Sequence, residues 1–166
     1  PMMVEYESPF PKENHLNLIV PETTTRYTKR GKEMYLKIAQ KLDSLTKVSP
    51  GNSVIFFPSY NLLENIFMQF KELTNKQIFL ERPGLSKIEK EDLINKFKEE
   101  SSKGGILMGV SAGNFGEGVD LPGDLLQGVI IVGLPLGKPD LETKELVDYY
   151  EIKFGNNFYD LIINKI

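Results

Sequence analysis

Short apolar runs alternate with longer amphipathic stretches along this chain, and this alternation is what most restricts its fold. The apolar runs lie at 53–58, 77–80, 106–110 and 128–134 and are rich in residues that favour strands. Between them, apolar side chains recur at helical spacing, as in the stretch 59–73. Buried strands that alternate with amphipathic helices predict a mainly parallel sheet with right-handed crossovers. We therefore expect an α/β fold of three layers, with helices on both faces of the sheet.

Capping signals support the helices that this alternation predicts. Ser59 can cap the helix that follows the first apolar run, because its hydroxyl can accept a hydrogen bond from the first turn. Ser86 and Glu89 have the spacing of a capping box. Near the N-terminus, Leu16, Leu18 and Val20 occupy alternate positions before Pro21, which predicts a strand there. The predicted helices are 32–45, 59–73, 86–103, 139–154 and 158–166.

Size and composition limit the possible classes of protein. A chain of 166 residues fits one domain, and a net charge of −3 argues against a surface that is basic all round. Because the sequence has no cysteine, it holds no disulfide, thiolate metal site or cysteine nucleophile. The apolar runs are far shorter than the roughly 20 residues that span a bilayer, and we expect no membrane partner and a cytoplasmic location.

The most distinctive loop is 113–122, which reads Gly-Asn-Phe-Gly-Glu-Gly-Val-Asp-Leu-Pro and follows a predicted buried strand. Its three glycines allow backbone torsions that other residues avoid, and Glu117 and Asp120 bring two carboxylates to the end of the strand. In parallel sheets, ligands bind beyond the carboxyl ends of the strands. The loops after Phe57 and Val110 are therefore the places to look for a site. Glycine and aspartate are also ordinary turn formers, so a plain turn is the alternative.

Familiar catalytic patterns are missing from the sequence. Gly31-Lys32 and Gly137-Lys138 are not followed by Ser or Thr, so there is no phosphate-cradling P-loop. His15 is the single histidine and has no neighbouring ligand of the kind that a zinc site needs. No catalytic metal and no serine or cysteine triad is predicted.

Four segments, in order, resemble the second motor domain of superfamily-two DNA helicases of the XPD/DinG type, and most closely archaeal XPD. Ser8-Pro9-Phe10-Pro11, followed by Asn14, is similar to the entry into that domain, and the stretch 54–60 resembles helicase motif IV. The stretch 115–123, Phe-Gly-Glu-Gly-Val-Asp-Leu-Pro-Gly, resembles motif V and is the most specific match. The stretch 129–139 is similar to the strand and loop that follow motif V.

The resemblance implies a RecA-like domain that contributes half of an ATP cleft. In this family two such domains close on ATP and Mg²⁺, and Glu117, Gly118 and Asp120 would face the cleft between them. Asp120 would bond a ribose hydroxyl or help to order water and magnesium at the phosphates. The alternative is that Glu117 and Asp120 cap the following turn.

The same resemblance places single-stranded DNA beside the predicted helix that starts at Ser59 and Tyr60. Free backbone N–H groups and the serine hydroxyl there suit a phosphate, whatever the base. Ser111, Asn114 and Phe115 would add a phosphate contact or a face for base stacking. The alternatives are that Ser59 serves only as a helix cap and that Phe115 fills core space.

The chain also departs from the family pattern, because motif VI is expected just after residue 166. The Walker motifs and the cysteines for an iron-sulphur cluster are expected in a missing first half, whose helicase domain would be the partner of residues 1–166. We therefore expect part of an ATP-dependent DNA helicase, moving 5′ to 3′ and acting in DNA repair. The isolated fragment is expected to be inactive as an ATP hydrolase.

Two other classes of function stay open. One is a stand-alone α/β module that uses the glycine loop to bind a phosphorylated ligand or a protein. The other is a structural interaction domain in which Tyr149, Tyr150 and Phe154 form an apolar contact surface. Tight binding by this chain alone would be the mark of the first.

Overall fold

The computed structural model describes residues 6, 16–116, 119–134 and 141–154. The chain forms two compact units, Pro1–Gly133 and Leu134–Ile166, and each is described by itself. The first unit holds the sheet and the predicted site.

A parallel four-stranded sheet forms the centre of the first unit. Its strands are β1 (Ser53–Phe57), β2 (Ile78–Leu80), β3 (Ile106–Val110) and β4 (Gly128–Ile131), in the order β2-β3-β1-β4. In the register Phe57 lies opposite Val110, so β1 and β3 end side by side. The prediction of a parallel sheet is therefore confirmed.

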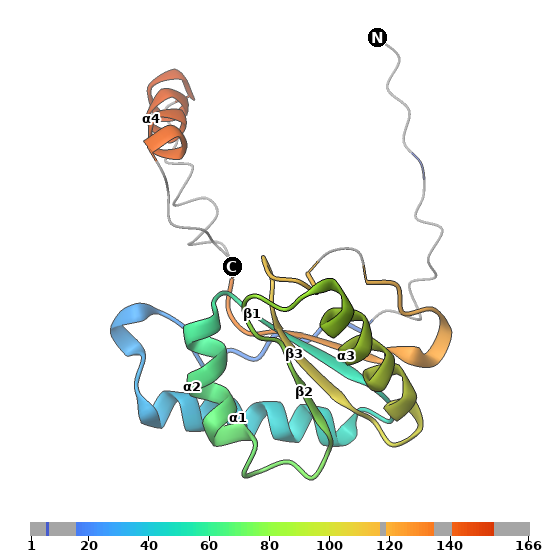
Figure 1. Ribbon diagram of the computed structural model, residues 1–166. Helices are drawn as coiled ribbons and strands as arrows, with labels where there is room; N and C mark the ends of the chain where they lie inside the picture. Colours follow the sequence, from blue (N-terminus) through green and yellow to red (C-terminus); the bar gives the residue numbers. More distant parts are fainter. Residues whose placement is uncertain (1–5, 7–15, 117–118, 135–140, 155–166) are drawn as a thin grey trace. The chain divides into compact units, whose positions relative to one another are not determined.

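Helices cover both faces of this sheet, so the predicted three-layer arrangement is confirmed. Helices α1 (Lys32–Val48) and α2 (Tyr60–Phe70) pack on one face, and α3 (Lys87–Glu99) packs on the other. Figure 1 shows α2 and α3 on opposite sides of the strands. Three short 3-10 helices complete the described part of the unit: η2 (Tyr27–Lys29), η3 (Glu100–Ser102) and η4 (Gly123–Leu125).

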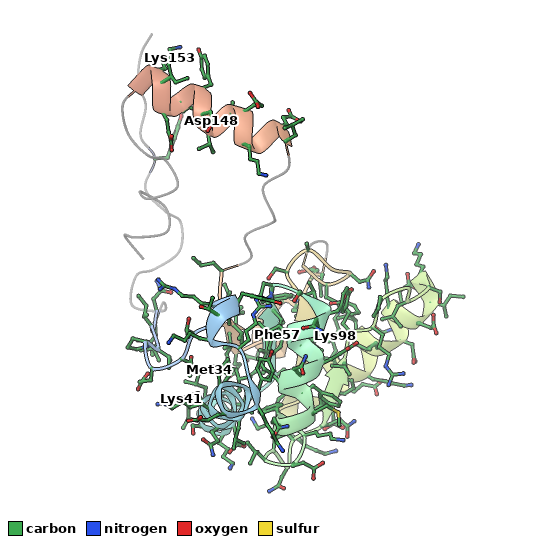
Figure 2. The ribbon with its side chains drawn as sticks, turned by 90° about the vertical axis from the view of Figure 1, so that its left-hand side faces the viewer. Met34, Lys41, Phe57, Lys98, Asp148 and Lys153 are labelled. Carbon is green, nitrogen blue, oxygen red and sulfur yellow. The ribbon has the colours of Figure 1, made fainter. Side chains whose placement is uncertain are left out.

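Alternate side chains of each strand feed two separate cores, as the two-residue period of a strand requires. Ile55 and Phe57 of β1 point to the α1 and α2 side, where they join the larger buried cluster. Phe57 lies in the interior of this cluster, and Lys41 projects from α1 (Figure 2). Val54 of β1 points the other way and packs with Phe97 of α3.

Within the described residues, the edge strand β4 is covered on one face only. Ile130 packs against the larger cluster, but Val129 is 57% exposed and Ile131 is 63% exposed. Both of these side chains lie on the α3 face of the sheet, because they are in register with Val54 and Phe56 of β1.

Both predicted helix caps are present. The side chain of Ser59 accepts a hydrogen bond from the Leu62 amide at the start of α2. At the start of α3, the Ser86 hydroxyl accepts from the Glu89 amide, and the Glu89 carboxylate accepts from the Ser86 amide. These caps fix where the two helices begin after β1 and β2.

Two predicted strands differ from the structure, and three helices end at other residues than predicted: α1 ends at Val48 rather than at 45, α2 at Phe70 rather than at 73, and α3 at Glu99 rather than at 103. The stretch 16–20 forms no strand, and Leu16, Leu18 and Ile19 are exposed, so its apolar alternation does not pair with the sheet. Strand β4 ends at Ile131 rather than at Leu134, because Gly133 adopts φ 75°, which an extended strand excludes.

The described part of the second unit is helix α4 (Leu141–Phe154), as predicted. Its exposed large apolar residues include Leu146, Tyr149 and Tyr150. Asp148 and Lys153 project from this helix in Figure 2. The predicted helix 158–166 lies outside the described residues. None of the helices in the described part of the chain has the length and hydropathy needed to cross a membrane.

Candidate functional site

The loops that follow β1 and β3 begin next to each other. The Ser111 amide donates a hydrogen bond to the Phe57 carbonyl oxygen at 2.9 Å, which extends the β1–β3 pairing to the last residue of β1. After β1 the chain enters α2, and after β3 it enters the glycine loop. The two segments that carried most of the predicted site are thus neighbours at the carboxyl end of the sheet.

The start of α2 presents polar groups at this end of the sheet. Ser59 has an extended backbone and its hydroxyl oxygen lies 3.4 Å from the Leu62 nitrogen that donates to it. The first amides of a helix have no partner within the helix, and the helix dipole makes this end electropositive. This terminus therefore favours an anion such as a phosphate group.

Tyr60 turns its hydroxyl away from solvent and towards a carboxylate. The hydroxyl donates to Glu81 Oε1 at 2.8 Å. Burial, together with the hydrogen bond to Glu81 and the charge of that carboxylate, raises the pKa of Tyr60 to about 12. The Tyr60 hydroxyl is therefore committed to an internal hydrogen bond, and the predicted DNA contact at this residue would have to use its backbone amide.

Glu81 follows β2 directly and is the centre of the polar contacts at this end of the sheet. It is 1% exposed. Its Oε2 accepts from the Val110 amide at 2.8 Å, and its Oε1 accepts from the Asn114 amide at 2.5 Å as well as from Tyr60. One carboxylate thus joins the end of β3, the glycine loop and the start of α2.

The close approach of Glu81 explains why two residues near it are glycine. A Cβ at Gly109 would lie 2.7 Å from Glu81 Oε2, and a Cβ at Gly113 would lie 2.5 Å from Oε1. No Cβ is found at such distances, so any side chain at either position would displace the carboxylate. Gly113, which the sequence indicated as a residue that allows torsions other residues avoid, has no positive φ and instead leaves room for a buried group.

The remaining predicted site residues have different environments. Ser111 and Asn114 are half-buried at the rim, and Asp120 is exposed on the glycine loop. Glu117 and Gly118 lie outside the described residues.

Phe115 belongs to the core. It is 5% exposed and packs in the smaller cluster with Val54, Leu107 and Phe97. A ring in this position has no free face for a nucleic-acid base. The structure therefore supports the alternative in which Phe115 fills core space and anchors the glycine loop to the sheet.

No metal centre is built from the described residues, since no three His, Asp or Glu side chains among them lie together. Asp120 is the loop carboxylate within the described stretch that is free to approach a magnesium ion carried by a nucleotide. Magnesium usually keeps several waters and takes one or two protein carboxylates, so a single aspartate fits that form of binding. A chain without cysteine supplies no thiolate to an iron-sulphur cluster.

Glu81 was not predicted from the sequence. It stands in Leu-Glu-Arg-Pro-Gly, which reads as the polar exit from a short strand. Its three hydrogen-bond donors come from positions 21 to 33 residues away along the chain. A local pattern contains no signal for such a contact.

Comparison with known proteins gives consistent matches. The family model described as "Helicase C-terminal domain" matches residues 42–165. A probable ATP-dependent helicase of Methanocaldococcus jannaschii is 32% identical over 158 residues, which cover 89% of this chain and 23% of that protein. The ATP-dependent DNA helicase CHL1 of Yarrowia lipolytica is 34% identical over 134 residues, covering 73% of this chain and 16% of that protein.

Solved structures agree with these sequence matches. A structure titled as an XPD helicase superposes with a TM-score of 0.60 at 22% identity, covering 83% of this chain and 24% of that one. The likeness shows a shared fold. This chain spans less than a quarter of the length of the relatives and the structure named above.

Proposed function

This chain belongs to the helicase C-terminal domain family, and on that premise we propose that it is one part of an ATP-dependent DNA helicase that acts in DNA repair. The predicted resemblance to helicases of the XPD/DinG type and the RecA-like fold are both confirmed. In the proposal this chain supplies contacts to single-stranded DNA and half of an ATP cleft, and the parent protein moves 5′ to 3′.

One observation supports the proposed DNA contact above all others. The end of β1, which leads into α2, and the end of β3, which leads into the glycine loop, are joined by the hydrogen bond from the Ser111 amide to the Phe57 carbonyl oxygen. Ser59 and Ser111 are half-buried, and their hydroxyls can donate to a phosphate of the DNA backbone. The free amides of the first turn of α2 can do the same, and none of these contacts reads the bases. Asn114 is proposed to add a further phosphate contact.

The proposed nucleotide contact lies further along the same loop. Asp120 is exposed, as a residue that completes a cleft with another domain must be. We assign it the bond to a ribose hydroxyl or to the water around a nucleotide-bound magnesium ion, with Glu117 and Gly118 beside it. The other wall of the cleft, the P-loop and any iron-sulphur cluster belong to the proposed first helicase domain, which is the partner of this chain.

The proposal is tested with a labelled oligothymidylate and the purified chain. We expect weak binding, with a Kd on the order of 10–100 µM at physiological salt, and an affinity that falls as salt rises. We expect no ATP hydrolysis, since a phosphoryl-transfer site in this family is completed by the P-loop. Fluorescence anisotropy and a phosphate-release assay measure the two properties.

A matched pair of cap variants makes the test specific. Ser59→Ala and Ser86→Ala each remove the N-cap of one helix and should each lower the free energy of unfolding by about 1 kcal/mol. Only Ser59→Ala should weaken DNA binding, by roughly three- to tenfold, because Ser86 caps α3, which packs on the opposite face of the sheet from α2. Equal effects of the two variants on DNA affinity would contradict the proposed contact. Tight binding of a small phosphorylated ligand or a protein by the chain alone would favour the stand-alone module.

A further inference from the structure

We propose that Glu81 is a positioning residue that sets the geometry of the DNA contact by holding the glycine loop and the start of α2 in one fixed arrangement. The inference rests on the proposed function, because it concerns the same site. Glu81 itself does not touch the DNA, since its side chain is buried.

Glu81 stands where the chain of β2 separates from β3. Its own amide still donates to the Met108 carbonyl oxygen at 2.9 Å, as in the regular parallel ladder. At the next amide of β3 that faces this side, Val110, the Glu81 carboxylate accepts the bond in place of a backbone carbonyl. The main chain after Glu81 therefore no longer pairs with β3 and can turn towards α3. Strand β3 continues in register with β1 into the segment that carries Ser111.

The carboxylate then joins this loop to α2. Oε1 accepts from both the Asn114 amide and the Tyr60 hydroxyl, which belong to the two segments that form the proposed DNA contact. The spacing between those segments is set by one rigid, planar group. Loss of that group would leave Ser111 in place through its bond to Phe57 but would free the rest of the turn.

A carboxylate is the group that this position requires. Three donors point at Glu81, two of which are backbone amides that cannot accept. Glutamine has one acceptor oxygen and one NH₂ group, so in either orientation its NH₂ faces the Val110 or the Asn114 amide, donor against donor. A Glu81→Gln change therefore loses at least one backbone hydrogen bond while keeping the size of the side chain.

The decisive experiment compares Glu81→Gln with the unchanged chain for DNA affinity and amide hydrogen exchange. The variant removes one negative charge, so a purely electrostatic role predicts tighter binding to DNA. The positioning role predicts the opposite result, and DNA affinity should fall about five- to tenfold. Hydrogen exchange should rise at least about tenfold at the Val110 amide, the Asn114 amide or both, which corresponds to roughly one lost hydrogen bond.

Gly109→Ala provides a second variant should Glu81→Gln fail to fold. The three nearest atoms to a Cβ at position 109 all belong to the Glu81 side chain, so this change would displace the carboxylate without changing any charge, and the same two effects are expected. The control is Asn52→Ala, which removes a comparable buried network at the opposite end of the sheet. Asn52→Ala should lower stability and leave the affinity of the folded protein for DNA unchanged.

The outcomes separate the two proposals. DNA affinity that is unchanged or higher in Glu81→Gln, while the unchanged chain binds DNA, overturns the positioning role and leaves the proposed function intact. Unchanged exchange at both amides also overturns it. If the unchanged chain fails to bind DNA at all, the proposed function fails, and the inference fails with it.

Discussion

Each end of the parallel sheet has a buried polar side chain that bonds to main-chain groups. Side chains at the amino end donate to carbonyl oxygens, whereas the side chain at the carboxyl end accepts from amides. At the amino end, Asn52 donates to the Phe97 carbonyl oxygen and accepts from the Gly105 amide, each at 2.6 Å. Nearby, the Lys76 ammonium group donates to the Thr46 and Ser49 carbonyl oxygens at 2.8 and 2.9 Å. At the carboxyl end, Glu81 accepts from three donors and donates nothing.

The difference follows from the direction of the helices. In an α/β unit the helices end where the strands begin, so unpaired carbonyls gather at the amino end and attract a cation such as Lys76. The helices begin where the strands end, so unpaired amides gather at the carboxyl end. That end therefore receives anions, whether as the buried carboxylate of Glu81 or as a phosphate outside it.

The largest expected effect tests whether Phe115 belongs to the core or to the carboxyl-end site. Phe115→Ala should lower the free energy of unfolding by about 3–5 kcal/mol, as expected for a buried ring whose removal leaves a cavity. Chemical denaturation measures this loss, and Ile88→Ala, at an exposed position on α3, should change stability little. A stable Phe115→Ala protein with weakened DNA binding would show instead that the ring serves as a stacking face.

A smaller effect is expected at the amino end. Lys76→Met should cost about 2 kcal/mol of stability, because two carbonyl oxygens at the end of α1 lose a charged donor. DNA affinity, measured by anisotropy, should stay the same although a positive charge is gone. Lys71→Met, at an exposed position, is the control for stability. A clear loss of DNA affinity in Lys76→Met would mean that the two ends are not functionally distinct.

The smallest effect concerns Tyr60 and depends on pH. Tyr60→Phe should lower stability by about 1 kcal/mol at neutral pH, since one donor to Glu81 is lost. The pKa of Tyr60 is raised from 10.0 to about 12, so folding favours its protonated form. The stabilisation is fully present below pH 10.0 and is lost as pH rises towards 12.

Unfolding curves at a series of alkaline pH values measure this change. The difference in stability between the unchanged chain and Tyr60→Phe should shrink between pH 10 and 12. A difference that stays constant over that range would show that the hydroxyl is not buried against the carboxylate.

The sequence predicted the sheet and its helices well because their signals are local. The continuous apolar run before Ser59 and the capping box of Ser86 and Glu89 each give direct evidence of one element, and both features are present. The stretch 16–20 failed because apolar alternation does not reveal whether a neighbouring strand is available to pair with.

The candidate site was predicted less completely. The loops after Phe57 and Val110, where the sequence predicted a site, begin side by side, since parallel strands that pair in register end at the same edge. Glu81 was missed because its burial depends on amides and a hydroxyl from distant segments, and a glutamate beside Arg82 and Pro83 reads as exposed. The roles of Glu117 and Gly118 stay predictions.

The edge strand β4 has one covered face and one exposed face, and this difference indicates how a further strand could be connected beside it. Between β2 and β3 the connection through α3 runs on the α3 face as it moves towards β4. A right-handed crossover to any new parallel strand outside β4 moves in the same direction and must pass over that same face. Such a crossover would cover the exposed side chains of Val129 and Ile131. The handedness of the fold and the exposed apolar surface of β4 therefore indicate the same face of the sheet.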